Sequence, residues 1–177
     1  KNLSLSKTNQ PLPSPKQHKI NRAHLIMTLL TNQINAKDRI VISLGDPAGI
    51  GTEITLKALA SKYLPPNLKP LLVGCKENIQ KTYSHLHSLG IKRLVNIQDI
   101  EIIDLPFKGN LQIGTASQET GSASFLYVNN AVKILLKKEA RALVTAPIAK
   151  HAWHSAGHIY AGQTELLGKL TKVQNPS

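Results

Sequence analysis

The sequence predicts an α/β fold in which a mainly parallel sheet is flanked by helices, and two observations carry this prediction. Short apolar runs that contain β-branched residues alternate along the chain with longer segments of helical spacing. The first apolar run stops at Gly45, and a loop that also contains Gly49 and Gly51 leads directly into a helical segment. A strand, a glycine loop and a helix in that order are typical of a parallel sheet, although the pattern does not give the order of the strands.

The first half of the chain alternates between strand and helix patterns. Residues 40–44 are apolar and rich in β-branched side chains, so they predict a buried strand. Apolar side chains at helical spacing predict a helix over residues 52–63, which two prolines end. Residues 70–75 predict a second short strand, and the helical pattern of residues 77–89 stops at Gly90.

The second half continues the alternation. Residues 94–104 predict one or two short strands and lead into a polar loop over residues 106–114. The strongest helical pattern covers residues 119–139, where apolar residues recur on one stripe and lysines near the end suit the helix dipole. Residues 142–147 predict a further strand, which we expect to be buried.

The composition divides the chain into two regions. The chain has 177 residues and a net charge of +12, and residues 1–39 hold seven of its 22 basic groups but one of its ten acids. Residues 1–36 are therefore expected to form a disordered basic extension, in which Met27 is the natural start and the residues before it are not native. Residues 37–177 are expected to form the folded part.

The composition also argues against several classes of partner. Basic residues do not alternate with aromatic ones as in a nucleic-acid-binding surface, and no apolar run approaches the roughly 18 residues of a membrane span. The single cysteine, Cys75, cannot form an internal disulfide and is expected to be a buried, inert thiol, so nothing favours secretion. We expect a cytoplasmic protein that binds neither nucleic acid nor membranes, and whose charge attracts anionic small molecules or aids solubility.

The most informative motif is the glycine loop of residues 45–51. Free backbone N–H groups and the positive end of a helix at this edge of a sheet commonly hold phosphates or carboxylates, and Asp46 is the one charged group in the loop. The spacing is neither that of a dinucleotide-binding fingerprint nor that of a P-loop. Two interpretations stay open on spacing alone: Gly49 and Gly51 permit a ligand to approach closely, or they permit a tight strand-to-helix turn.

A second group of polar residues follows the last predicted strand. Lys150 stands just beyond that strand, where it can hold a phosphate or carboxylate or can simply be solvated. Gln163 and Thr164 then begin a further helical segment. Thr164 can be the N-cap of that helix, or both side chains can offer hydrogen bonds to a polar ligand. A parallel sheet gathers such positions, so we expect Asp46, Lys150, Gln163 and Thr164 around one cleft.

These segments resemble the signatures of the 4-hydroxythreonine-4-phosphate dehydrogenase family of pyridoxal phosphate biosynthesis. Gly45-Asp-Pro-Ala-Gly-Ile-Gly51 is similar to its N-terminal signature, and Thr145-Ala-Pro-Ile-Ala-Lys150 followed by Gly162-Gln-Thr-Glu165 is similar to its second signature. The similarity runs from about residue 39 to residue 173, in the family's order. The family has Gly-His-Thr-Glu in the last segment, so Gln163 replaces a histidine and removes a cationic or proton-transfer role there.

The resemblance implies a particular fold and activity. The fold is the two-domain architecture of the isocitrate and isopropylmalate dehydrogenases, of which residues 37–177 supply the N-terminal portion, with the C-terminal half missing. The activity is oxidation of 4-phosphooxy-L-threonine to 2-amino-3-oxo-4-phosphooxybutanoate, which can lose its carboxyl group. NAD is the oxidant, and a divalent metal cation polarises the alcohol. The resemblance also implies a homodimer.

Site residues follow from the same resemblance. The family's His-Thr pair contacts the phosphorylated amino-acid substrate, so Gln163 and Thr164 are carried over as substrate-binding residues, with Asp46 and Lys150 expected beside them. The metal ligands, most of the NAD site and several phosphate contacts are expected in the missing half. We therefore expect the chain alone to be inactive, and no catalytic, cofactor or metal residue is assigned within it.

The histidines His151, His154 and His158 are the one candidate metal cluster in the sequence. His151 and His154 share a predicted helix face, but Gly157 ends that helix and no carboxylate or cysteine lies nearby in the sequence. Surface or partly buried histidines are therefore the favoured interpretation.

Three alternatives to the dehydrogenase assignment stay open. The chain can belong to a dehydrogenase of another four-carbon phosphorylated hydroxy acid, which Gln163 makes more plausible. It can belong to an acyl-phosphate transferase of related fold. A non-catalytic basic binding domain is supported by the charge alone.

Overall fold

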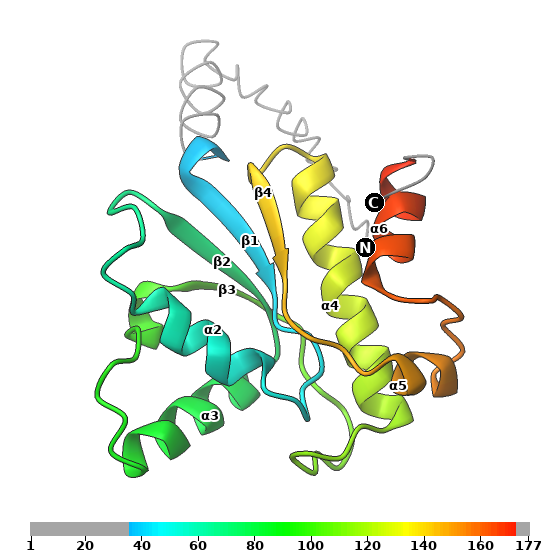
Figure 1. The fold of residues 1–177 in the computed structure, drawn as a ribbon, viewed down its shortest axis with the longest axis horizontal. Coiled ribbons are helices and arrows are strands. Elements are labelled where there is room, and N and C mark those ends of the chain that lie inside the picture. Colours follow the sequence, from blue (N-terminus) through cyan, green and yellow to red (C-terminus); the bar gives the residue numbers. More distant parts are fainter. Residues whose placement is uncertain (1–35, 173–177) are drawn as a thin grey trace, which may run out of the picture.

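The computed structural model describes residues 36–172, and there the predicted α/β fold is confirmed (Figure 1). Residues 1–35 of the expected basic extension lie outside the described residues. Four parallel strands form one sheet in the order β3-β2-β1-β4. The strands are β1 (Arg39–Ser43), β2 (Lys69–Gly74), β3 (Glu101–Asp104) and β4 (Ala142–Thr145); the helices are α2 (Gly51–Leu59), α3 (Lys76–Ser88), α4 (Gln118–Leu136), α5 (Lys150–Ser155) and α6 (Gln163–Thr171), with a 3₁₀ helix η1 (Ile97–Asp99).

Helices cover both faces of the sheet, because side chains of a strand point alternately to opposite faces. Val41 of β1 faces Tyr127 of α4, in a cluster that also contains residues of β2. The next residue, Ile42, belongs to the opposite cluster, which packs on Leu56 of α2 and Ile79 of α3. The central strands β1 and β2 are therefore buried on both sides, as a parallel sheet requires.

The α5 and α6 helices do not cover the sheet directly but pack on the outer side of α4 (Figure 1). Trp153 of α5 is fully buried between Val128 of α4 and Leu166 of α6. Its indole Nε1 donates a hydrogen bond to Ser124 Oγ at 2.8 Å, so the buried polar atom of the ring is satisfied. This packing fixes where α6 begins, which matters for the site described below.

One expectation about the sheet is confirmed and another needs correction. Residues 94–104 contain one strand, β3, preceded by η1, which agrees with the one or two strands expected. The strand over 142–147 is shorter than expected and only half-buried, with Val144 47% exposed. Among the described residues β4 pairs with β1 alone, so its outer edge is open, and an apolar recess of about 220 Å³ lies beside it, lined in part by Ile54, Val144 and Pro147.

Within the described range, no helix combines the length and the hydrophobicity needed to cross a membrane.

The contact between α4 and α5 depends on Gly121. A Cβ built on Gly121 would lie 2.1 Å from the carbonyl oxygen of Ala152. We expect Gly121→Ala to lower the free energy of unfolding by about 1–3 kcal/mol, because backbone must move to relieve the collision. Urea unfolding measures this change. The neighbouring exposed residue offers a control, Ser122→Ala, which should change stability by no more than about 0.5 kcal/mol. Equal stability of the two variants would contradict this account.

Candidate functional site

The segments that follow β1 and β4 lie against each other at the carboxyl edge of the sheet. Asp46 N donates to Pro147 O at 3.0 Å, and Ala146 N donates to Ser43 O at 2.8 Å. Gly45 has a φ of +70°, and a Cβ at this position would lie 2.1 Å from Pro147 O. Both the conformation and the space therefore require glycine, and the glycine loop is held by the segment after β4.

Of the two interpretations left open for the loop glycines, packing accounts for Gly51. A Cβ on Gly51 would lie 2.1 Å from Leu44 O and 3.0 Å from Ala146 Cβ, so the space beside it is filled by the protein itself. Gly49 lies exposed in the turn, where its N–H donates to Asp46 O at 2.9 Å. The loop is therefore a tight strand-to-helix turn, and the described residues show no space at Gly51 for a cofactor's phosphates.

The Asp46 side chain is turned into its own loop. Its Oδ1 accepts a hydrogen bond from Ala48 N at 2.8 Å, and the residue is only 4% exposed. Such a contact two residues along the chain is a turn in which the side chain takes the place of a backbone acceptor. Asp46 is joined to the pocket described next only through its backbone bond to Pro147.

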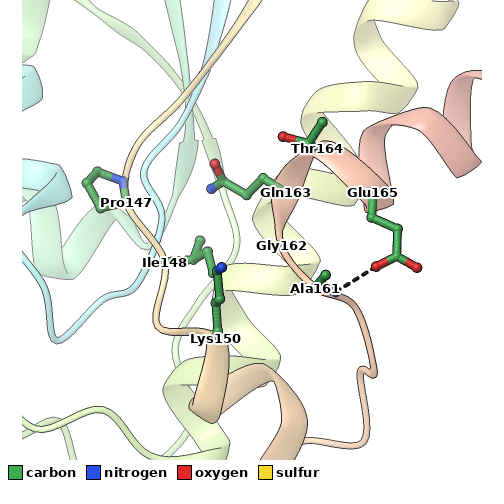
Figure 2. Close-up of a pocket in the computed structure, with 8 residues that line it drawn as sticks. All are labelled: Pro147, Ile148, Lys150, Ala161, Gly162, Gln163, Thr164 and Glu165. Carbon is green, nitrogen blue, oxygen red and sulfur yellow. Dashed lines mark hydrogen bonds between the residues drawn. The ribbon is translucent and has the colours of Figure 1, made fainter. Parts of the chain in front are cut away.

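The other three predicted site residues, Lys150, Gln163 and Thr164, line one open pocket of about 810 Å³ (Figure 2). The segment after β4 forms one side of it, and the starts of α5 and α6 complete it. The structure thus brings these residues together, and leaves the Asp46 side chain outside. The remaining lining residues are Pro147, Ile148, Ala161, Gly162 and Glu165.

The pocket is lined by one cation, Lys150, and one carboxylate, Glu165. Lys150 Nζ would lie 3.9 Å from a Cβ built on Gly162, which places the ammonium beside the N-terminus of α6. None of the ion pairs between described residues involves Lys150. Glu165 adds a carboxylate, but its Oε2 accepts from Ala161 N at 2.6 Å and so caps the backbone. An ammonium beside free N–H groups of a helix start suits a phosphate or a carboxylate.

Of the two interpretations left open for Thr164, the one in which it caps α6 is wrong. The N-cap residue is Gly162, two residues earlier, and the helix begins at Gln163; the backbone of Gly162 is extended. No side chain makes the capping hydrogen bond. The Thr164 side chain, exposed in the first turn, is therefore available to a ligand, as Figure 2 shows for its hydroxyl.

The histidine cluster has structural contacts of its own. His154 Nε2 lies 3.0 Å from Tyr160 O, and the His158 ring stacks on Phe125 with a centroid separation of 3.6 Å. Among residues 36–172 no three His, Cys, Asp or Glu side chains group together as metal ligands. The described residues therefore do not form a divalent-metal site by themselves.

Glu165 is the charged residue in the pocket lining that sequence reasoning did not assign to the site. It stands in the Gly162-Gln-Thr-Glu165 segment, so its position beside Thr164 was a usable signal. Its orientation back toward Ala161 could not be read from spacing.

The parallel sheet and the polar pocket beyond its carboxyl edge define an α/β protein with a pocket where the strands end, which is the place where such folds commonly bind small ligands. Comparison with known families makes the assignment specific: the model of the pyridoxal phosphate biosynthetic protein PdxA matches residues 66–177. The chain belongs to the PdxA family, and the resemblance to 4-hydroxythreonine-4-phosphate dehydrogenases is confirmed.

Individual relatives agree with this membership. The chain is 48% identical over 132 residues to a 4-hydroxythreonine-4-phosphate dehydrogenase of Synechococcus sp. (strain RCC307), covering 75% of this chain and 39% of the relative. A relative from Halalkalibacterium halodurans, provisionally named D-threonate 4-phosphate dehydrogenase, is 35% identical over 153 residues, covering 81% of this chain and 46% of the relative. The chain thus spans less than half the length of these relatives.

Solved structures confirm the predicted fold class. The crystal structure of a 4-hydroxythreonine-4-phosphate dehydrogenase from Burkholderia phymatum is similar, with a TM-score of 0.67 and 29% identity, and the match covers 80% of this chain and 46% of that one. The corresponding enzyme from Klebsiella pneumoniae gives a TM-score of 0.65 at 30% identity, over 77% of this chain and 44% of that one.

The Asp46 carboxylate should matter for stability through its bond to Ala48 N. We expect Asp46→Ala to cost about 1–3 kcal/mol of unfolding free energy, because the buried N–H is left without a partner. Asp46→Asn keeps an acceptor oxygen and should retain most of the stability. Chemical denaturation of both variants measures the difference, and equal losses would count against the proposed turn.

His158 should make stability depend on pH. Burial against Phe125 lowers the pKa of His158 below its usual value of about 6.5. The folded state then favours the neutral ring, so unfolding takes up protons near and below that pH, and stability falls as the pH drops through this window.

Replacing His158 by Phe keeps an aromatic ring over Phe125 but cannot titrate. We expect the stability difference between the variant and the wild type to be constant above about pH 7.5 and to shift in favour of the variant at lower pH. Thermal unfolding at a series of pH values checks this. A difference that stays constant down to pH 5 would contradict it.

Proposed function

We propose that the chain supplies part of the substrate site of a 4-hydroxythreonine-4-phosphate dehydrogenase that depends on NAD and a divalent metal cation. The whole enzyme oxidises 4-phosphooxy-L-threonine in pyridoxal phosphate biosynthesis, as a cytoplasmic homodimer. The observation that carries the proposal is the convergence of Lys150, Gln163 and Thr164 on one pocket. Family membership and the names of the relatives support it.

In this proposal the described residues bind and orient the substrate. Lys150 and the start of α6 hold an anionic group, either the phosphate or the carboxylate. Thr164 offers a hydroxyl that can donate or accept a hydrogen bond. The described residues include no group of three metal-ligating side chains, and in this proposal other residues of the enzyme hold the cation and most of the NAD. Holding the substrate in one geometry is itself a large contribution to rate.

One observation favours a second candidate. The relative from Halalkalibacterium halodurans carries the provisional name D-threonate 4-phosphate dehydrogenase. That substrate has a hydroxyl where 4-phosphooxy-L-threonine has an ammonium group. The glutamine at position 163, in place of the family's histidine, is a change in the pocket that such a difference in substrate could accompany.

The test compares both substrates in the full-length enzyme that contains these residues. NADH formation is measured with NAD, a divalent cation and either 4-phosphooxy-L-threonine or D-threonate 4-phosphate. We expect turnover of the first substrate to be faster. The reverse preference would favour the second candidate, and turnover of neither would contradict the proposed activity. The 177-residue chain should form no NADH, so turnover by it would contradict the partial-site proposal.

Thr164→Val in the same enzyme separates binding from stability. If the hydroxyl bonds the substrate, its loss should lower kcat/KM by about 5- to 150-fold, which corresponds to about 1–3 kcal/mol. The melting temperature should stay unchanged, because no side chain caps α6. Thr171→Val is the matched control: it removes a hydroxyl that donates to Leu167 O at 2.8 Å, at the other end of the same helix. Unchanged kinetics in Thr164→Val would contradict a substrate contact.

A further inference from the structure

The segment that joins α5 to α6 ends in the wall of the pocket. Residues 156–162 belong to neither helix nor strand, and Ala161 and Gly162 line the pocket just before α6 begins (Figure 2). The backbone of Gly162 is extended, and no side chain caps the helix there. The position of this wall therefore depends on how the residues before it, 158–160, are held.

Four aromatic side chains hold the segment against α4, and we call them the ring cluster. The His158 ring stacks on Phe125 of α4, with centroids 3.6 Å apart and planes inclined by 7°. The centroid of Tyr160 lies 5.8 Å from that of Phe125, and Trp153 of α5 meets Phe125 edge-on at 5.4 Å. The ring cluster thus joins α4 and α5 to the segment that leads to the pocket wall.

Backbone atoms tie the same segment to α5. His158 N donates to Trp153 O at 2.8 Å, and Tyr160 O lies 3.0 Å from His154 Nε2. The tie to α4 is made by rings instead, and the His158 stack has the shortest centroid separation in the ring cluster. Loss of this stack would therefore leave the segment attached to α5 but free to move relative to α4.

The charged surroundings of His158 include no carboxylate that pairs with it. The titratable side chains of the two helices on either side of the segment are Lys150, His151 and His154 of α5, and Glu165 and Lys169 of α6, while α4 has none between Glu119 and Lys133. Lys169 Nζ lies 5.3 Å from the Tyr160 centroid, and the Glu165 carboxylate bonds Ala161 N. None of the ion pairs between described residues involves His158.

The stack therefore favours the uncharged imidazole. Burial against Phe125 lowers the pKa of His158, because the charged ring loses hydration there. A ring that has left the stack and entered water has the ordinary pKa of about 6.5. Acid thus shifts the balance from the stacked ring toward the released one.

We propose that His158 is a positioning residue for the pocket: its neutral ring, stacked on Phe125, holds residues 158–162 in the shape that binds an anionic ligand, and protonation releases them. The affinity is then complete above about pH 7.5 and decreases as the pH falls through about 6.5. The inference rests on the proposed function, which supplies the ligand, and adds a pH response that the pocket residues themselves do not provide.

The experiment measures the Kd of 4-phosphooxy-L-threonine by calorimetry, in the full-length enzyme without NAD, between pH 5.5 and 8.5. The phosphate of the ligand itself titrates near pH 6, so the wild type is compared with His158→Phe, which keeps a ring on Phe125 but cannot titrate. The ratio of the wild-type Kd to the variant Kd should rise about two- to tenfold from pH 7.5 to 5.5. About tenfold is the limit for one proton, one pH unit below 6.5.

His87→Phe is the matched control. The His87 ring of α3 contacts Tyr83 with centroids 5.0 Å apart, and α3 packs on the face of the sheet opposite to α4. The variant therefore removes a histidine with an aromatic contact far from the pocket wall. The ratio of the wild-type Kd to the Kd of this variant should stay constant over the whole pH range.

His158→Ala removes the stack at every pH. At pH 7.5 it should bind the ligand about two- to tenfold more weakly than the wild type, whereas the ring of His158→Phe should restore binding. Hydrogen exchange without ligand gives a separate readout. Protection factors over residues 158–163, corrected for the intrinsic pH dependence of exchange, should be lower in His158→Ala than in His158→Phe. They should fall toward acid pH in the wild type and stay constant in His158→Phe.

The outcomes separate this inference from the proposed function. A wild-type to His158→Phe ratio that stays within twofold over the range would overturn the role of His158 alone. The same holds if the wild type binds relatively more tightly in acid, because His158 would then attract the anion as a charge. Failure of the wild type to bind 4-phosphooxy-L-threonine at any pH would overturn the proposed function, and the inference with it.

Discussion

The backbone of Ala146 and Pro147 is the point on which the carboxyl edge of the sheet depends. On one side, Ala146 N donates to Ser43 O at the end of β1, and Pro147 O accepts from Asp46 N in the loop that follows. On the other side, Ala146 O accepts from Gln163 at the start of α6. Two neighbouring residues thus set both the glycine loop and one wall of the pocket. Backbone atoms make these hydrogen bonds, but position 146 also requires a small side chain, because Ala146 is buried against Gly51.

The elements that were predicted well are those whose patterns depend on local chemistry. The strands β1 and β2 are continuous apolar runs, and α4 carries a regular apolar stripe, so burial on known faces follows from the sequence. The burial of β4 was predicted wrongly for a physical reason. An apolar sequence shows that a strand can be buried. Whether a neighbouring strand pairs with its outer edge depends on residues distant in the chain.

The site residues divide in the same way, into features that the sequence could indicate and features that depend on the folded arrangement. Lys150, Gln163 and Thr164 meet because parallel strands end at one edge of a sheet, which the order of motifs could indicate. The direction of the Asp46 side chain could not be predicted, because a short carboxylate can bond its own loop as readily as a ligand. The capping interpretation of Thr164 failed because the N-cap lies two residues earlier, at Gly162, so that Thr164 stands in the first turn of the helix.

The open edge of β4 and the apolar recess beside it have a consequence for the behaviour of this polypeptide in solution. Within residues 36–172 the outer edge of β4 pairs with no other strand, and such an edge beside exposed side chains, here Val144 and Ile54, is a template on which a second chain can pair. The net charge of +12 opposes that pairing by mutual repulsion. Since the repulsion is screened over about 8 Å at physiological ionic strength, colloidal stability of the 177-residue polypeptide should decrease as salt is added.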